Sequence, residues 1–156
     1  MADALAVSLK QPAIIGIDGW TGVGKTTLAS ALASSTGGST YDLDEALNGD
    51  QKSYVPALRL HKIATALASP CGFLFVSGIC LREVLQQAGC LADAHIYVKE
   101  MATWGWPDED ELEDYSLSRM RGSLGGEAVR QEMRIYHRRW QPHLRADFEF
   151  HRYECL

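Results

Sequence analysis

One octapeptide restricts the fold of this chain more than any other feature. It reads G-W-T-G-V-G-K-T, from Gly19 to Thr26, and it matches the pattern G-x-x-x-x-G-K-[ST] at every fixed position. The run before it, Ala13 to Asp18, is short, apolar and β-branched, which is typical of a buried parallel strand. The stretch after it, Lys25 to Ser34, is rich in alanine and predicts a helix.

A strand, a glycine-rich turn and a helix in this order form a cradle for phosphate groups. Glycines let the backbone adopt positive φ and approach an anion, so that successive amide N–H groups form an anion-binding nest. The N-terminus of the helix adds unpaired N–H groups. Lys25 is expected to reach the β- and γ-phosphates, and the Thr26 hydroxyl to ligate Mg²⁺. The predicted nucleoside triphosphate site consists of Gly19, Thr21, Gly22, Val23, Gly24, Lys25, Thr26 and Thr27.

Strands alternate with helices along the rest of the chain. Further strands are predicted at residues 39–42, 72–77, 94–99 and 146–151. Further helices are predicted at 51–69, at 79–88 and from the glycine pair 125–126 to about residue 140, whereas 104–114 reads as acidic and irregular. This alternation implies βαβ units, and therefore a three-layer α/β domain with a five-stranded parallel sheet. We expect residues 1–156 to form a single domain.

Charge, apolar content and cysteine spacing limit the classes of partner and the cellular compartment that are expected. The formal net charge of −5 argues against duplex nucleic acid as the main partner, because phosphate backbones require clustered Lys and Arg. No apolar stretch reaches about 18 residues, so no membrane span is expected. The cysteines lack C-x-x-C spacing and predict free thiols in a reducing cytoplasm. They are Cys71, Cys80, Cys90 and Cys155.

Three classes of nucleotide-binding protein do not fit. A GTPase would need an N-K-x-D motif to recognise its base, and the chain has none. Residues 123–127 superficially resemble an ABC ATPase signature, but the predicted strand at 146–151 does not end in an acidic pair. The helical lid domain of an AAA+ module does not fit in this length. A small-molecule kinase remains, which needs a phosphate cradle, an acidic residue and arginines for the phosphoryl charge.

Motifs spread over most of the chain carry a resemblance to a known superfamily. Between about Ala13 and Arg152 they are G-x-x-G-x-G-K-T-T-L, Y-D-L-D, F-V-S-G-I-C-L, H-I-Y-V-K and Y-H-x-x-W-x-P-x-x-x-A-D. In these motifs the chain resembles the uridine kinase-like and shikimate kinase-like branches of the P-loop kinases. The resemblance implies the strand order 2-3-1-4-5, ATP and Mg²⁺ as cofactors, and a lid insertion at about 101–134 between strands 4 and 5.

The same resemblance assigns roles to two acidic residues after the second strand. Asp42 and Asp44 stand where these kinases carry a D-x-D pair or a single catalytic Asp. Asp44 would orient the acceptor hydroxyl or act as its base, and Asp42 would lie nearer Mg²⁺, although the two roles could be exchanged. Alternatively, the pair only begins a helical turn. Ser77 ends the third strand where many relatives carry an acid, so metal support falls to Asp18, Asp42 or a water.

Arginines are the candidates for charge neutralisation and substrate binding. In these kinases lid arginines bridge donor and acceptor phosphates, and Arg130 and Arg134, four apart on one helical face, are the candidates here. By the same resemblance Arg82 would hold an anionic substrate group, and Arg59 lies on a helix that often walls the acceptor pocket. As alternatives, Arg59 and Arg82 are ordinary helix surface and the lid pair forms salt bridges. The acidic partners for such bridges would be Glu127, Glu132 and the acidic stretch before them.

Together these features predict an ATP-dependent phosphotransferase that moves the γ-phosphoryl group to a hydroxyl of a nucleoside-like or other small metabolite. The predicted catalytic residues are Lys25, Asp44, Asp42, Arg130 and Arg134, with Thr26 and Asp42 at the metal and Arg82 and Arg59 at the substrate. Two alternatives stay open, a regulatory nucleotide-binding module with little turnover and a kinase with a macromolecular acceptor. The identity of the acceptor, the choice between ATP and GTP, and the oligomeric state stay open at this point.

Overall fold

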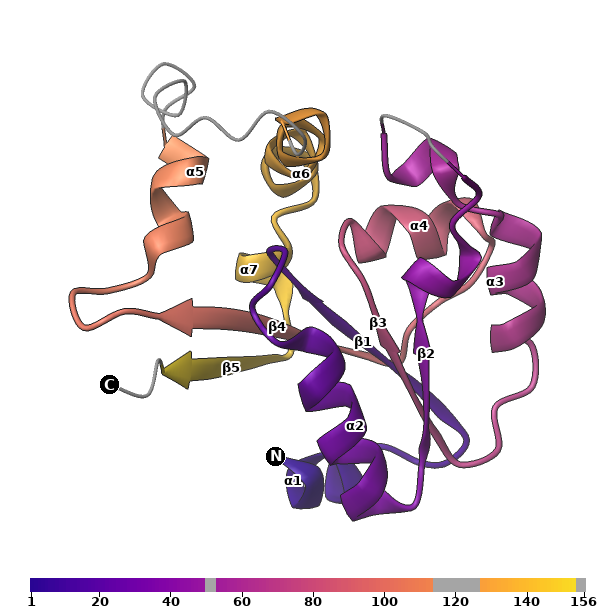
Figure 1. The fold of residues 1–156 in the computed structure, drawn as a ribbon. Helices are drawn as coiled ribbons and strands as arrows, with labels where there is room; N and C mark the ends of the chain where they lie inside the picture. Colours follow the sequence, from indigo (N-terminus) through magenta and orange to yellow (C-terminus); the bar gives the residue numbers. More distant parts are fainter. Residues whose placement is uncertain (50–52, 114–126, 154–156) are drawn as a thin grey trace.

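A five-stranded parallel sheet forms the centre of the fold (Figure 1). The computed structural model describes residues 1–49, 53–113 and 127–153. The strand order is β2-β3-β1-β4-β5, so the predicted fold class and order are confirmed. The strands are β1 (Ala13–Gly19), β2 (Ser39–Asp42), β3 (Phe73–Ser77), β4 (Ala94–Met101) and β5 (Phe148–Tyr153).

Burial of the strands follows their position in the sheet. Every residue of β3 is buried, and β1 is buried except at Ile14. The edge strands β2 and β5 have only half-buried and exposed residues. Central parallel strands are covered on both faces and therefore read as continuous apolar runs. This is why the central strands are the clearest elements in the sequence.

Helices lie on both faces of the sheet. The chain runs from β1 through α2 (Lys25–Thr36) to β2, toward one edge of the sheet, and from β3 through α4 (Leu81–Gln87) to β4, toward the other edge. Because both crossovers are expected to be right-handed, the two helices fall on opposite faces. The other helices are α1 (Ala2–Ser8), α3 (Leu60–Leu67), α5 (Asp110–Glu113), α6 (Glu127–Trp140) and α7 (Pro142–Arg145).

The prediction of one long helix at 51–69 is wrong in its first half. The structure has a short 3-10 helix, η2 (Val55–Ala57), and α3 begins only at Leu60. Pro56 lies in the first turn of η2, and the extended residue Leu58 forms an antiparallel bridge with Leu47 that interrupts helical structure. The apolar residues whose spacing fits one helix are buried on two separate elements, η2 and α3. Residues 51 and 52 lie outside the described residues.

Smaller differences concern the ends of elements. The helix predicted from residue 79 begins at Leu81, because Cys80 adopts a left-handed conformation with φ +53°. The last strand begins at Phe148 rather than at residue 146. The acidic stretch at 104–114 contains the 3-10 helix η3 (Pro107–Glu109) and α5. The helix α1 at the N-terminus has no counterpart in the prediction.

The predicted lid falls in the connection between β4 and β5. Its described parts are η3, α5 and the first turns of α6. Residues 114–126, which include the glycine pair, lie outside the described residues. The helix α6 continues past residue 134 to Trp140. The lid and the single-domain boundaries stay predictions.

The thiols and the membrane prediction can be compared with the described part of the chain. Cys71, Cys80 and Cys90 are free thiols there, and Cys155 lies outside it. Within residues 1–49, 53–113 and 127–153, no helix has both the length and the apolar character needed to cross a membrane. A reducing cytoplasm as the compartment stays a prediction.

A close contact at the end of β3 leads to a stability prediction. A Cβ atom on Gly78 would lie 2.5 Å from Cδ1 and 2.9 Å from Cβ of Leu43, whose side chain is fully buried. Gly78→Ala is therefore expected to lower the free energy of unfolding by about 2 kcal/mol, as over-packing does, in a denaturant titration. Adding Leu43→Ala removes Cγ and Cδ1, the two nearest crowding atoms, and leaves only the contact with Cβ. A double variant whose loss equals the sum of the single losses would contradict the contact.

Candidate functional site

The glycine-rich loop lies at the carboxyl end of β1 and turns directly into α2. Gly22 and Gly24 have φ values of +84° and +94°, in the left-handed region that glycine adopts without steric cost. Gly24 is the N-cap of α2, so the free amides of the first helical turn follow the loop immediately. The predicted strand, loop and helix around residues 19–26 are therefore all present.

A cavity of about 460 Å³ opens at this loop. We call it the main cavity. From the residues predicted for catalysis and for the metal, it brings together Lys25, Thr26, Asp42 and Asp44. Its other lining residues are Thr21, Gly22, Gly24, Thr27, Leu47, Tyr54, Gly78, Ile79 and Val129. A cationic phosphate cradle and two carboxylates thus share one cavity.

Lys25 presents an ammonium group close to the loop. Its Nζ donates a hydrogen bond of 2.6 Å to the carbonyl oxygen of Trp20, and the side chain is only 9% exposed. Burial lowers the pKa of Lys25, and attraction by nearby carboxylates, first of all Asp18, opposes that shift. A buried ammonium interacts strongly with phosphate oxygens because the local dielectric is low.

Asp42, at the end of β2, contacts one residue of helix α2 and one residue of strand β3. Its Oδ2 accepts hydrogen bonds from the hydroxyls of Thr26 at 2.7 Å and Ser77 at 3.2 Å. The β2–β3 register pairs Asp42 directly with Ser77. The carboxylate that the sequence lacks at the end of β3 is therefore supplied by the neighbouring strand, at the same level of the sheet.

Asp42 also begins a 3-10 helix, η1 (Leu43–Ala46). Its Oδ1 accepts a hydrogen bond of 3.0 Å from the amide of Asp44, and the amide of Asp42 donates one of 3.3 Å to the Glu45 carboxylate. The alternative interpretation of the acid pair as the start of a helical turn is thus also present. It does not compete with the cavity position, because Asp42 uses its two oxygens separately.

Asp44 lines the main cavity together with Tyr54. Its Oδ1 accepts a hydrogen bond of 2.7 Å from the hydroxyl of Tyr54, whose side chain is buried. Burial and the hydrogen bond to Asp44 raise the pKa of Tyr54 strongly, so the phenol stays a donor. Tyr54 therefore fixes the orientation of one Asp44 oxygen and leaves the other carboxylate oxygen for further contacts.

Asp18 is buried behind the loop. Its carboxylate accepts a hydrogen bond of 2.8 Å from the amide of Gly19 and a second one from the hydroxyl of Tyr136 on α6. Burial raises the pKa of Asp18 from its usual 3.8 to about 6, although the Tyr136 hydrogen bond opposes the shift. These contacts give Asp18 the role of holding the first residue of the loop.

The raised pKa of Asp18 predicts a pH-dependent stability. The folded chain holds this proton more tightly than the unfolded chain, so the contribution is full below pH 3.8 and is lost as the pH rises through about 6. Relative to Asp18→Asn, the free energy of unfolding of the unmodified chain should therefore fall over this interval by on the order of 3 kcal/mol. Denaturant titrations at several pH values measure the difference. A difference independent of pH would contradict the assignment.

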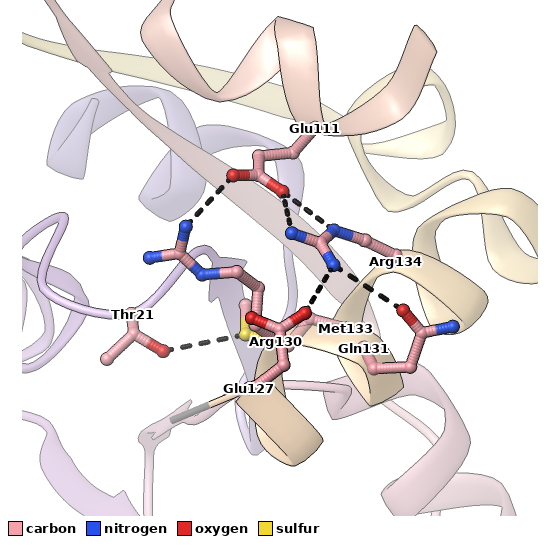
Figure 2. Close-up of polar contacts among 7 residues, drawn as sticks. All are labelled: Thr21, Glu111, Glu127, Arg130, Gln131, Met133 and Arg134. Atoms are coloured by element: carbon pink, nitrogen blue, oxygen red, sulfur yellow. Dashed lines mark hydrogen bonds and ion pairs between the residues drawn. The ribbon is translucent and has the colours of Figure 1, made fainter. Parts of the chain in front are cut away.

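Arg130 and Arg134 of α6 both contact Glu111 of α5 (Figure 2). The nitrogen–oxygen distances are 3.0 Å for Arg130 and 2.7 Å for Arg134, and Arg134 also pairs with Glu127 at 3.0 Å. Burial would lower the pKa of Arg134, but the hydrogen bonds to the two glutamates outweigh it and raise the pKa. The salt-bridge alternative is thus present for both arginines. Their role at the phosphoryl group stays a prediction.

Arg59 and Arg82 bind backbone carbonyls. Arg59 donates to the carbonyl oxygens of Ala46 at 3.4 Å and Leu47 at 3.0 Å. Arg82 donates to the carbonyl oxygen of Arg145 at 2.7 Å. Neither is among the residues that line the main cavity in the described part of the chain. A role in substrate binding would require the guanidinium groups to leave these carbonyls, and it stays a prediction.

A second cavity, of about 370 Å³, adjoins the loop on the side of β5. It lies between the first turns of α2 and the edge strand. Its lining is largely apolar and consists of Gly24, Thr27, Leu28, Ala31, Phe150 and Arg152. Arg152 also donates a hydrogen bond of 3.4 Å to the carbonyl oxygen of Gly22. Gly24 and Thr27 line both cavities, which are therefore adjacent.

Two residues at the site were missed by sequence reasoning. Tyr54 lies inside the segment 51–69 that was predicted as one continuous helix, so its proximity to Asp44 was not visible. Glu132 was considered only as a partner of the lid arginines, whereas its carboxylate accepts hydrogen bonds from the backbone amides of Tyr54 and Val55. The partners in these contacts are 78 and 77 residues apart in the sequence, so no local sequence pattern predicts them.

Comparison with known proteins identifies the fold. No model of a protein family matches the chain, and no curated protein matches it in sequence. Among solved structures, one described as a possible uridine kinase from Bacillus stearothermophilus is similar over 96% of both chains, with a TM-score of 0.61 and 15% identity. A shikimate kinase from Acinetobacter baumannii, in complex with shikimate, is similar over 99% of this chain and 89% of its own, with a TM-score of 0.52 and 20% identity. The chain therefore has the fold of the P-loop kinases.

Proposed function

We propose that the chain is an ATP-dependent phosphotransferase that transfers the γ-phosphoryl group to a hydroxyl of a nucleoside-like or other small metabolite. One observation carries the proposal. A single cavity is lined by the loop lysine Lys25, by the hydroxyl of Thr26 and by two carboxylates, Asp42 and Asp44. These are the groups that phosphoryl transfer requires, because its catalysis consists of positioning and of stabilising negative charge.

The donor half of the proposal rests on the loop. The amides of residues 22–26 and the ammonium of Lys25 would hold the triphosphate. Thr26, with Asp42 and Ser77 beside it, forms a set of oxygen ligands of the kind that Mg²⁺ prefers. Among the described residues there is no group of three His, Cys, Asp or Glu side chains suited to a metal. That fits Mg²⁺, which usually binds through one or two carboxylates, waters and substrate phosphates.

Thr26 and Asp42 would hold the metal, which would supply positive charge to offset the negative charge that develops during transfer. We assign Asp42 to this side of the cavity, because its Oδ2 already contacts the Thr26 hydroxyl at 2.7 Å. Asp44 is assigned to the acceptor. It would accept the hydrogen bond of the attacking hydroxyl and then its proton, while the Tyr54 hydrogen bond holds the carboxylate in place.

The remaining proposed roles concern the nucleotide base, the lid arginines and the walls around the acceptor. The second cavity, apolar and adjacent to the loop, suits the nucleotide base. Arg130 and Arg134 would neutralise transition-state charge once they exchange Glu111 for phosphate oxygens. Leu47, Tyr54, Ile79 and Val129 would form the walls around the acceptor.

The ion pairs of the lid arginines favour a second candidate function. If Arg130 and Arg134 keep Glu111 when nucleotide is bound, the transferring group lacks their charge. The chain would then bind nucleotide as a regulatory module with little turnover. A kinase with a macromolecular acceptor is the third candidate, and it would differ from the first only in the product.

Release of ADP from Mg-ATP in the presence of an acceptor panel tests the proposal. The panel should contain nucleosides such as uridine, shikimate and simple sugars, each compared with a sample without acceptor. The proposal predicts that at least one member stimulates ADP release well above the background rate. Saturable ATP binding without stimulation by any member would favour the regulatory module.

A further inference from the structure

One face of helix α6 contacts two parts of the site. These are the glycine-rich loop, which is the proposed donor side, and the segment at Tyr54, which is the proposed acceptor side. Val129 lines the cavity, and Glu132, Met133 and Tyr136 follow at spacings of three and four residues, which places them on the same face. On the donor side, the Thr21 hydroxyl contacts the Met133 sulfur at 3.5 Å (Figure 2). Tyr136 binds the carboxylate behind the loop. The fourth residue of this face, Glu132, extends toward the acceptor side.

The carboxylate of Glu132 holds the start of η2. Its Oε2 accepts a hydrogen bond of 2.6 Å from the amide of Tyr54, and its Oε1 accepts one of 2.9 Å from the amide of Val55. These amides belong to the N-terminus of a helical turn, where backbone N–H groups have no partner within the helix. Hydrogen bonds from amides to an ionised carboxylate are about twice as strong as neutral ones. We call this two-point contact the Glu132 clamp.

The Tyr54 residue connects the Glu132 clamp to the main cavity, because Glu132 binds its amide and its side chain lines the cavity. The Tyr54 side chain is 7% exposed, and its hydroxyl donates a hydrogen bond of 2.7 Å to Asp44. A displacement of the Tyr54 backbone would move this hydroxyl and release Asp44. Three residues from three elements thus form a chain from α6 to the carboxylate proposed to meet the acceptor.

We propose that Glu132 is a positioning residue for phosphoryl transfer, which fixes Tyr54 and, through Tyr54, the reactive orientation of Asp44. This inference rests on the proposed function of Asp44. The clamp belongs to the same helix as Arg130 and Arg134, so one rigid element would set both the acceptor carboxylate and the lid arginines. A misplacement of about 1 Å at the reacting groups costs on the order of 100-fold in rate, so such support has a measurable effect.

Glu132→Gln is the main test variant, because it keeps the size of the side chain but leaves one oxygen to accept two amides. It should lower kcat about tenfold and raise the KM for the acceptor about fivefold, while the KM for ATP changes by less than about twofold. Glu83→Gln on α4 is the matched control, since its carboxylate accepts a hydrogen bond of 3.3 Å from the Gln87 side chain on the same helix. It should behave like the unmodified chain.

Tyr54→Phe separates positioning through Tyr54 from a general effect on folding. This variant keeps the backbone amides and loses only the hydroxyl that reaches Asp44. In this background Glu132→Gln should lower kcat by less than about twofold further, because the link is already broken. Full tenfold loss in both backgrounds, or equal loss of affinity for ATP and acceptor, would overturn the proposal in favour of a structural role.

Amide hydrogen exchange tests the clamp without catalysis. The amides of Tyr54 and Val55 should be protected in the unmodified chain and should exchange at least about tenfold faster in Glu132→Gln. Unchanged exchange would overturn the clamp. If the unmodified chain transfers no phosphoryl group to any acceptor while the exchange result holds, the proposed function fails and the clamp stands as a structural contact only. The two failures are thereby distinguishable.

Discussion

Lys25→Ala should lower kcat/KM for phosphoryl transfer by about 1,000-fold, which corresponds to roughly 4 kcal/mol of transition-state stabilisation. The Lys25 ammonium is 9% exposed and lines the main cavity, so its interaction with phosphate oxygens is poorly screened by water. The loss should exceed any effect on ATP affinity, because charge on the transferring group and the leaving oxygen develops in the transition state. Steady-state rates with saturating and with limiting ATP measure both effects.

The same variant should fold normally. Burial lowers the pKa of Lys25, which means that the folded chain carries the charged form at a cost, and removal of the charge does not lower stability for that reason. Lys62→Ala, an exposed lysine on α3, is the matched control and should retain full activity. Transfer by Lys25→Ala at a rate within a few-fold of the unmodified chain would contradict the role of the loop.

Asp44→Asn should lower kcat by about 100- to 1,000-fold with little change in the KM for ATP. Asparagine can still accept the hydrogen bond of the Tyr54 hydroxyl, so the geometry is expected to persist. It cannot take the proton of the acceptor hydroxyl, and the base contribution is lost. Rates measured at saturating Mg-ATP over a range of acceptor concentrations give kcat and KM separately.

Asp42→Asn is the companion variant, because the two carboxylates have different partners. Asp42 accepts from Thr26 and Ser77, so its loss should raise the Mg²⁺ concentration needed for half-maximal activity. Asp44→Asn should leave that concentration unchanged. The opposite pattern, with the Mg²⁺ requirement shifted by Asp44→Asn, would show that the two roles are exchanged.

Much of the fold could be predicted because its signals are local. The apolar run from Phe73 to Ser77 is a central strand, and a helix follows the loop at Lys25, as the residue types indicate. The loop is a contiguous motif, and the strand before it and the helix after it could be predicted from the residues next to it. The errors lie where tertiary contacts override periodicity. Pro56 and the bridge at Leu58 divide a segment whose apolar spacing fits one helix.

The candidate site could be predicted only in part, because its long-range pairings have no local signature. Ser77 at the end of β3 weakened the case for a metal-supporting acid, and only the strand register reveals that Asp42 lies beside it. Glu132 has the charge and helical position of an ordinary surface residue, yet it binds the amides at the start of η2. Such contacts depend on how α6 packs against η2 and the carboxyl end of β1, which composition and spacing do not determine.

Label transfer from ATP tests the central claim most directly. The chain is incubated with Mg-ATP labelled in the γ-phosphoryl group and with the acceptor panel, and the small molecules are separated from protein and nucleotide. We expect the label to appear in a small phosphorylated product, and Lys25→Ala and Asp44→Asn to abolish nearly all of it. Label that remains in ATP, or that leaves only as inorganic phosphate or on a macromolecule, would contradict the account.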